Sequence, residues 1–175
     1  MEGFKLAQHI ILIGFMGAGK SSVARKLARF ENMNSIDMDI YIEREAGMKI
    51  PQIFALEGEA GFRQRETIFL ESLFRRDRCI LSCGGGVVTR DENRRALKLL
   101  GTVVYLQVSA AEALSRIEHP ESRPLLNGDT PPGELLAART ALYEDAADII
   151  VDTSGRSLSE VTSEVIKALR QVGAL

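Results

Sequence analysis

A phosphate-binding loop near the start of the chain has the clearest chemistry in this sequence. Residues 14–21 read G-F-M-G-A-G-K-S, a full match to G-x-x-x-x-G-K-[ST]. In such a loop the backbone N–H groups and the positive end of the following helix both point at a phosphate. Lys20 adds a cation between the β- and γ-phosphates, and the Ser21 hydroxyl is suited to Mg²⁺. The alternative is a glycine-rich turn that binds nothing.

The residues on either side of this phosphate loop support nucleotide binding. His9–Ile13 reads as a short buried strand, and residues 22–30 have helical spacing with Val23, Leu27 and Phe30 on one face. A strand, a glycine loop and a helix in this order are the setting that the motif requires.

Two carboxylates, Asp37 and Asp39, stand at the end of a second predicted strand, Ser35–Met38. Alternate residues of a strand point to the same side, and this strand end lies beside the phosphate loop in a doubly wound sheet. One carboxylate could hold a Mg²⁺-bound water and the other a substrate hydroxyl. The alternative is two surface acids that cap a helix at Ile40–Ala46.

Short apolar runs alternate with stretches of helical period along the rest of the chain. The predicted strands are His9–Ile13, Ser35–Met38, Cys79–Ser82, Val103–Val108 and Asp148–Val151. A helix is expected over Glu59–Phe74, and later helices are expected to begin with capping boxes at Thr89–Glu92, Ser109–Glu112 and Ser157–Glu160. This alternation predicts an α/β fold, a parallel sheet with helices on both faces, in one domain of residues 1–175.

One segment breaks this pattern. Residues 117–133 are rich in proline, with Asn127-Gly128 and mixed charges, so they cannot be regular structure for long. A loop of this length in a compact domain is usually functional. We expect a mobile lid that folds over a bound nucleotide.

Composition narrows the class and the location of the protein. A net charge of −2 gives no support to nucleic-acid or membrane-surface binding. Cys79 and Cys83 lie too far apart on a predicted strand for a disulfide, and two thiols without a nearby histidine are too few for a structural zinc site. Reduced thiols and no visible targeting segment predict a cytoplasmic protein. The sequence shows no conspicuous apolar patch, so a monomer is expected by default.

The remaining motifs favour a small-molecule kinase over other users of this loop. The guanine-reading pattern [NT]-K-x-D of GTPases is absent from the sequence. The third predicted strand runs into Cys83 and three glycines without the acidic residue that AAA-type and transport ATPases carry there.

In this order, the motifs closely resemble the shikimate kinase family over nearly the whole chain. The matching segments are Gly14–Ser22, Ile36–Asp39, Ile50–Glu66, Cys83–Val88, Arg123–Leu126 and Arg139–Asp148. The resemblance implies a three-layer α/β/α fold with a five-stranded parallel sheet, like that of P-loop nucleoside-monophosphate kinases, and a mobile lid at about 117–133.

The resemblance also assigns a substrate site. Shikimate carries one carboxylate and three hydroxyls on a six-membered ring. Arg63 and Arg139 match the family's carboxylate-binding pair, and Asp39 matches the acid that accepts hydrogen bonds from ring hydroxyls. Glu66 could orient Arg63 from the same helix. The residues expected to let backbone approach the ring are Gly84, Gly85 and Gly86.

For the nucleotide, the resemblance places Arg116 over the adenine, Arg156 in the adenine loop, and Arg123 of the lid on the phosphates. Ser21 and Asp37 would hold Mg²⁺. The residues expected to wrap the phosphates are Gly17, Ala18, Gly19, Lys20, Ser21 and Ser22.

The implied reaction is ATP-dependent phosphorylation of the shikimate 3-hydroxyl, giving shikimate 3-phosphate and ADP on the route to aromatic amino acids. Its catalytic residues would be Lys20, Asp39 and Arg123. Three alternatives stay open: a gluconate kinase, an adenylate-kinase-like enzyme, and a non-catalytic nucleotide-binding module.

Overall fold

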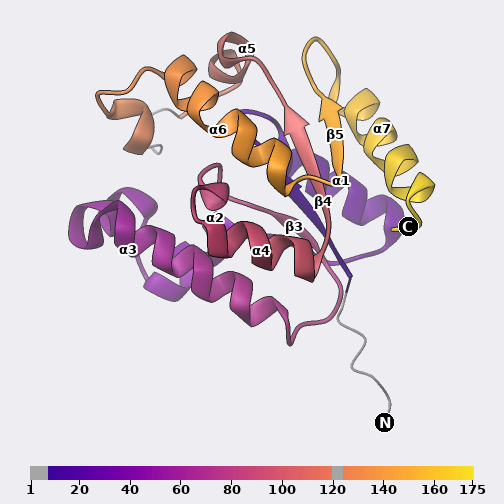
Figure 1. The fold of residues 1–175 in the computed structure, drawn as a ribbon, viewed down its shortest axis with the longest axis horizontal. Helices are drawn as coiled ribbons and strands as arrows, with labels where there is room; N and C mark the ends of the chain where they lie inside the picture. Colours follow the sequence, from indigo (N-terminus) through magenta and orange to yellow (C-terminus); the bar gives the residue numbers. More distant parts are fainter. Residues whose placement is uncertain (1–7, 120–123) are drawn as a thin grey trace.

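The protein is built on a parallel β-sheet. The computed structural model describes residues 8–119 and 124–175. Across these ranges, five strands pair in parallel in the order β2-β3-β1-β4-β5 (Figure 1). They are β1 (His9–Ile13), β2 (Ser35–Asp37), β3 (Ile80–Ser82), β4 (Gly101–Gln107) and β5 (Ile149–Asp152). The predicted parallel α/β architecture is therefore confirmed.

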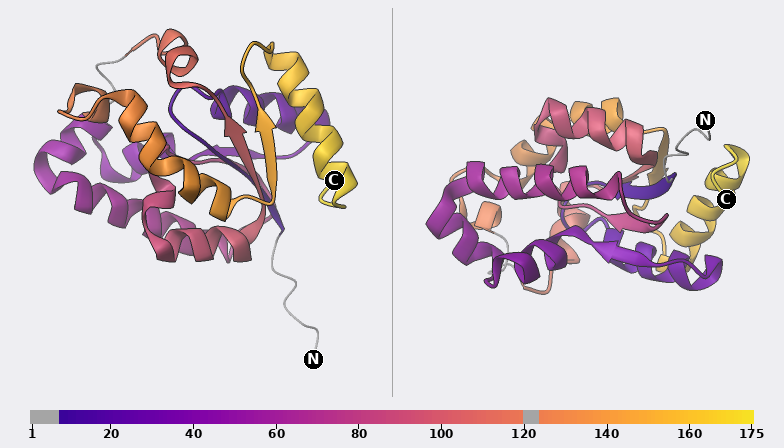
Figure 2. Two further views of the ribbon diagram at one scale, coloured as in Figure 1. Left: turned by 45° about the horizontal axis from the view of Figure 1, so that its top comes forward. Right: turned by 90° about the horizontal axis from the view of Figure 1, so that it is seen from below.

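Helices cover both faces of this sheet. They are α1 (Lys20–Glu31), α2 (Met38–Ala46), α3 (Ile50–Leu73), α4 (Asp91–Leu100), α5 (Ala110–Ser115), α6 (Pro132–Ala146) and α7 (Leu158–Gln171). Two short 3₁₀ helices, η1 (Val87–Thr89) and η3 (Pro124–Asn127), lie in connections. Helices α1 and α7 pack on one face, while α4 and α6 pack on the other with α3 beside α4 (Figure 2).

The burial of the central strand, β1, explains why this strand could be recognised in the sequence. Every residue of β1 is buried, and Ile10–Ile13 expose none of their surface. A strand covered by helices on both faces reads as a continuous apolar run. The phosphate loop that follows β1 is thereby fixed at the carboxyl edge of the sheet, where ligands bind in open α/β folds.

Helix α3 bends where the sequence suggested that a helix begins. Gly58 has φ 70° and ψ 179° inside the hydrogen-bonded span Ile50–Leu73, a left-handed φ that favours glycine. The predicted helix at Glu59 is the part after this kink, and it presents Phe62 and Arg63 as buried side chains.

Two details of the predicted helices are wrong. Phe30, in the last turn of α1, is 67% exposed rather than on the packed face of the helix. Helix α4 begins after Arg90 and has no side-chain cap. Thr89 does not cap it, because its hydroxyl donates instead to the carbonyl of Gly86, 2.7 Å away.

The other two predicted caps form at least in part. Ser157 and Glu160 make the complete capping box of α7. Ser109 accepts from the N–H of Glu112 at the start of α5, but the Glu112 carboxylate does not return to Ser109 and contacts Arg116 instead. That carboxylate becomes part of the site described below.

The cysteines are buried and unbridged, but one has an unexpected neighbour. The Nδ1 atom of His9 lies 3.3 Å from Cys79 Sγ. The expectation that no histidine lies near the cysteines was therefore wrong, because His9 is distant in the sequence but adjacent in the fold. Nε2 of His9 lies 3.1 Å from the carbonyl of Leu73, where it can only donate, and Nδ1 therefore accepts from the Cys79 N–H. Burial lowers the pKa of His9.

The predicted lid is only partly within the described ranges. Arg123 lies outside them, so its position is not described. Pro124–Asn127 forms η3, and α6 already begins at Pro132. The single domain of residues 1–175 and the movement of the lid stay predictions. No helix in the described parts of the chain is both long and apolar enough to span a membrane.

Candidate active site

Two adjoining cavities open at the carboxyl edge of the sheet. The large cavity, of about 630 Å³, follows the phosphate loop and reaches Arg116, Thr153 and Arg156. The small cavity, of about 60 Å³, lies among α3, the loop after β3 and α6. Residues that line both are Met16, Ile50, Asp39 and Gly85. An anionic ligand in one cavity would therefore lie beside a ligand in the other.

The phosphate loop has the backbone that the motif predicts. Gly17 has φ 78°, and a Cβ there would lie 2.3 Å from the carbonyl oxygen of Ala113. Gly19 precedes α1 in a left-handed conformation and supplies no side-chain cap. Because the first N–H groups of a helix lack partners within it, those of α1 are left for a ligand in the large cavity.

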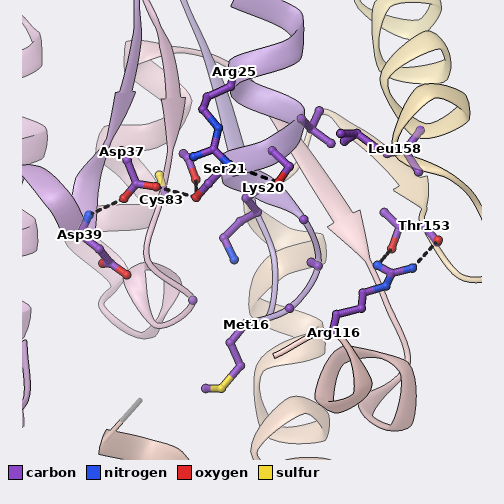
Figure 3. Close-up of a pocket in the computed structure, with 18 of the residues that line it drawn as sticks. Met16, Lys20, Ser21, Arg25, Asp37, Asp39, Cys83, Arg116, Thr153 and Leu158 are labelled. Carbon is purple, nitrogen blue, oxygen red and sulfur yellow. Dashed lines mark hydrogen bonds between the residues drawn. The ribbon is translucent and has the colours of Figure 1, made fainter. Parts of the chain in front are cut away.

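Lys20 is positioned by the loop that it follows. Its Nζ donates to the carbonyls of Gly14 and Phe15, at 2.8 and 2.9 Å, and the residue is 9% exposed. Figure 3 shows its side chain extending into the large cavity, between Asp39 and Arg116. The cation is thus held within the loop where phosphates are expected.

Oxygen atoms gather beside the start of α1. The Ser21 hydroxyl donates to Oδ2 of Asp37 at 2.5 Å and lies 3.1 Å from the hydroxyl of Ser82 (Figure 3). Oδ1 of Asp37 caps α2, accepting from the N–H groups of Asp39 and Ile40. Asp37 therefore caps a helix, as the alternative interpretation expected, and it also contacts Ser21 of the phosphate loop; its role toward Mg²⁺ stays a prediction.

Ser82 is a residue that the sequence analysis missed. It ends β3, between β1 and β2, at the place where the analysis noted only that an acid is absent. Hydroxyl and carboxylate oxygens are the donors that Mg²⁺ prefers, with waters and substrate phosphates completing its shell. The donor set of Ser21, Asp37 and Ser82 fits that ion.

The far end of the large cavity is a hydrogen-bonded junction of α5 with the loop after β5. Arg116 donates to the hydroxyl and the carbonyl of Thr153, at 3.1 and 2.9 Å, and pairs with Glu112. Glu112 also accepts from the N–H of Gly155 at 3.0 Å. Arg156 lines the same cavity but is exposed. The sequence analysis missed both residues at this site: it named Glu112 only as part of a capping box, and it did not name Thr153.

In the small cavity, Arg63 is held by two carboxylates of its own helix. Its guanidinium donates to Glu66 at 2.8 Å and to Glu59 at 3.0 Å, and it is almost fully buried. This is the orientation of Arg63 by Glu66 that the spacing suggested. Burial raises the pKa of Glu66 to about 7, although the positive charge of Arg63 acts in the opposite direction.

Arg139, from α6, faces the same cavity and is also buried. Among the described residues, its Nη1 atom has no hydrogen-bond partner, and neither has Oε1 of Glu66. A buried guanidinium nitrogen without a partner is costly, and such groups commonly mark a missing ligand. The cavity is thus prepared for a small anion that carries hydrogen-bonding groups.

The glycines after β3 have a role besides the one expected. A Cβ at Gly86 would lie 2.1 Å from Nη2 of Arg63, and one at Gly84 would lie 2.7 Å from Oε1 of Glu66 and 2.9 Å from Oδ1 of Asp39. These two glycines make room for the protein's own charged side chains. Both also line the small cavity, and the close approach of their backbone to a ligand stays a prediction.

This crowding gives a first prediction. Gly86→Ala is expected to displace the Arg63 guanidinium and to raise the KM for the ligand of the small cavity about tenfold or more, the worth of one charge-assisted hydrogen bond. Steady-state kinetics measure it. Gly133→Ala is the matched control, because a Cβ there meets nothing within 4 Å. An unchanged KM in Gly86→Ala would show that Arg63 tolerates the methyl group.

Comparison with known proteins decides the family. Residues 16–170 match the family model described as Shikimate kinase. The chain belongs to the shikimate kinase family. A curated shikimate kinase from Halorhodospira halophila is 42% identical, over 97% of this chain and 98% of the relative. One from Pseudomonas aeruginosa is 40% identical, over 94% and 97%.

Solved structures agree with this assignment. A shikimate kinase from Acinetobacter baumannii in complex with shikimate superposes with a TM-score of 0.88, at 35% identity and 99% coverage of both chains. One from Aquifex aeolicus gives 0.81 at 32% identity, covering 96% of this chain and 100% of that one. A gluconokinase from Sinorhizobium meliloti shares the fold alone, at 0.61 and 20% identity. The expected kinase class is confirmed.

Proposed function

We propose that this member of the shikimate kinase family transfers the γ-phosphoryl group of ATP to the 3-hydroxyl of shikimate. The observation that carries the proposal is the buried Arg139 Nη1 without a described partner, in a small cavity that Arg63 and Met16 of the phosphate loop also line. A ring carboxylate there would supply the missing hydrogen-bond acceptor. The Acinetobacter relative was solved with shikimate, which supports the same ligand here.

Asp39 is suited to act between the two cavities, since it lines both of them. Its carboxylate would accept a hydrogen bond from the acceptor hydroxyl and orient that hydroxyl toward the γ-phosphate. It could take the proton late in the transfer, as a general base. Because phosphoryl transfer passes through a loose transition state, such positioning supplies much of the catalysis.

Lys20 would balance charge on the moving phosphoryl group, since its Nζ is held in the loop where the phosphates bind. Arg123, in the part of the lid that is not described, is proposed from the resemblance to close on the same group. Ser21 and Asp37 would hold Mg²⁺, with Ser82 beside them, and the ion would neutralise phosphate charge. At the adenine end, Arg116 and Arg156 would flank the base.

The three alternatives predict different acceptors. Two buried arginines line the small cavity, a pairing that suits a carboxylate better than a second nucleotide, which speaks against an adenylate-kinase-like reaction. ADP release should be measured with ATP and Mg²⁺ plus shikimate, gluconate, AMP or no acceptor. We expect release with shikimate alone. Release with gluconate or AMP, or none with any acceptor, would overturn the proposal.

Removing one arm of the carboxylate clamp gives a second prediction. Arg139→Ala should weaken shikimate binding by about tenfold to a hundredfold, because a charge-assisted hydrogen bond is lost, and leave ATP binding nearly unchanged. Titration calorimetry with each ligand measures both. Arg95→Ala is the control, since Arg95 is exposed on α4 and forms an ion pair with Asp91. Weaker ATP binding with normal shikimate binding would mean that Arg139 serves the nucleotide in the large cavity, and not shikimate in the small one.

The cytoplasmic location and the monomeric state are proposals as well. The two cysteines are buried and unbridged, which agrees with reducing surroundings.

A further inference from the structure

A buried tyrosine on α6 contacts the site without lining either cavity. Tyr143 lies one helical turn after Arg139 and exposes none of its surface. Its hydroxyl donates a short hydrogen bond to the carbonyl oxygen of Gly85. Gly85 belongs to the loop after β3 and lines both cavities, so the tyrosine holds the backbone between them.

The side chain of Arg139 lies beside the same hydroxyl. Burial raises the pKa of Tyr143 far above its usual value, and the positive charge of Arg139 acts against that rise. The phenol therefore stays protonated at neutral pH. It donates to Gly85 and leaves its oxygen as an acceptor on the side of Arg139.

The ring of Tyr143 is held in place by β4. It stacks on Tyr105, with ring centroids 5.0 Å apart and an interplanar angle of 23°. Tyr105 is buried in the central part of the sheet. A ring fixed in this way gives the hydroxyl a defined position, which a solvent-exposed tyrosine would not have.

The loop that contains Gly85 packs against the rest of the site. A Cβ built on it would lie 3.4 Å from the backbone nitrogen of Met16 and 3.6 Å from the carbonyl of Gly14, so this loop packs directly on the phosphate loop. Its neighbours, Gly84 and Gly86, pack on Glu66 and Arg63. A shift of the Gly85 carbonyl would therefore first displace the side chains of Glu66 and Arg63.

We propose that the Tyr143 hydroxyl is a positioning group for the acceptor: it fixes the Arg139 guanidinium and the Gly85 carbonyl so that Nη1 of Arg139 faces the small cavity. Without the hydroxyl, the Gly85 carbonyl loses a donor and the buried guanidinium of Arg139 loses a polar neighbour, and both must find other partners. The guanidinium then competes for partners that the ligand would otherwise meet. This inference rests on the proposed function.

The test compares two variants that each remove one hydroxyl from the same stacked pair. Tyr143→Phe is expected to raise the KM for shikimate about tenfold, with kcat and the KM for ATP within about twofold of wild type. Tyr105→Phe, the matched control, should leave all three constants unchanged. Both variants keep the rings and their stacking, so thermal melting should show folded proteins.

A double-mutant cycle separates positioning from general support of the fold. If Tyr143 acts through Arg139, the effects of Tyr143→Phe and Arg139→Ala on shikimate binding must be less than additive in free energy. Additive effects, an unchanged shikimate KM in Tyr143→Phe, an equal change in Tyr105→Phe, or failure of Tyr143→Phe to fold would each overturn the inference. Failure of the proposed function is recognised separately, because wild type would then release no ADP with shikimate.

Discussion

Replacing Lys20 by alanine is expected to lower kcat for phosphoryl transfer by about a hundredfold or more, the usual worth of a charge aimed at the transition state. The ammonium is held by the carbonyls of Gly14 and Phe15, within the loop where we propose that the transferred group binds. Its loss should affect kcat more than the KM for ATP, because the glycine loop and the N-terminus of α1 still bind phosphate.

Lys26→Ala is the matched control for this variant. Lys26 lies on the same helix, two turns from the loop, and its ammonium contacts Ser159 of α7 rather than the phosphate loop. Lys26→Ala should release ADP at the wild-type rate, and circular dichroism should show both variants folded. If Lys20→Ala kept more than about a tenth of the wild-type rate, the lysine would not have the assigned role.

The fold could be predicted because its signals are local. Strand β1 is apolar throughout since both of its faces are covered, and the phosphate loop must follow such a strand. The start of α7 was also predictable, since Ser157 and Glu160 satisfy each other within one turn. Thr89 and Glu92 have the same spacing, yet Thr89 bonds to Gly86 in the preceding turn. Pattern alone cannot tell which nearby backbone group a hydroxyl will choose.

The site residues that the sequence did not reveal depend on contacts between distant segments. Ser82 approaches Ser21 only because β3 pairs with β1. Thr153 meets Arg116 only because β5 ends beside α5. Gly86 was expected at the site, but its need to leave room for the buried guanidinium of Arg63 also comes from a distant segment. None of these pairs has a characteristic spacing along the chain, so only the packed structure can bring them to notice.

Asp37, the last residue of β2, and Asp39, in the first turn of α2, should be separable by a Mg²⁺ titration. Asp39→Asn keeps the size of the side chain and one acceptor oxygen, but it removes the charge proposed to orient and finally deprotonate the acceptor hydroxyl. Because Asp39 lines both cavities, we expect kcat to fall by about a hundredfold, in the range of general-base contributions, with the Mg²⁺ dependence nearly unchanged.

Asp37→Asn should instead raise the Mg²⁺ concentration needed for half-maximal rate, because its Oδ2 contacts Ser21, with which it is proposed to hold the metal. The variant is well matched to the first, since the asparagine side chain can still cap α2 through its remaining oxygen. Activity is measured at saturating ATP and shikimate while Mg²⁺ is varied, so the two variants differ in the shape of the curve as well as its height. A Mg²⁺ shift in Asp39→Asn and none in Asp37→Asn would mean that the carboxylate at the edge of both cavities serves the metal, and that the one bonded to the phosphate loop serves the acceptor.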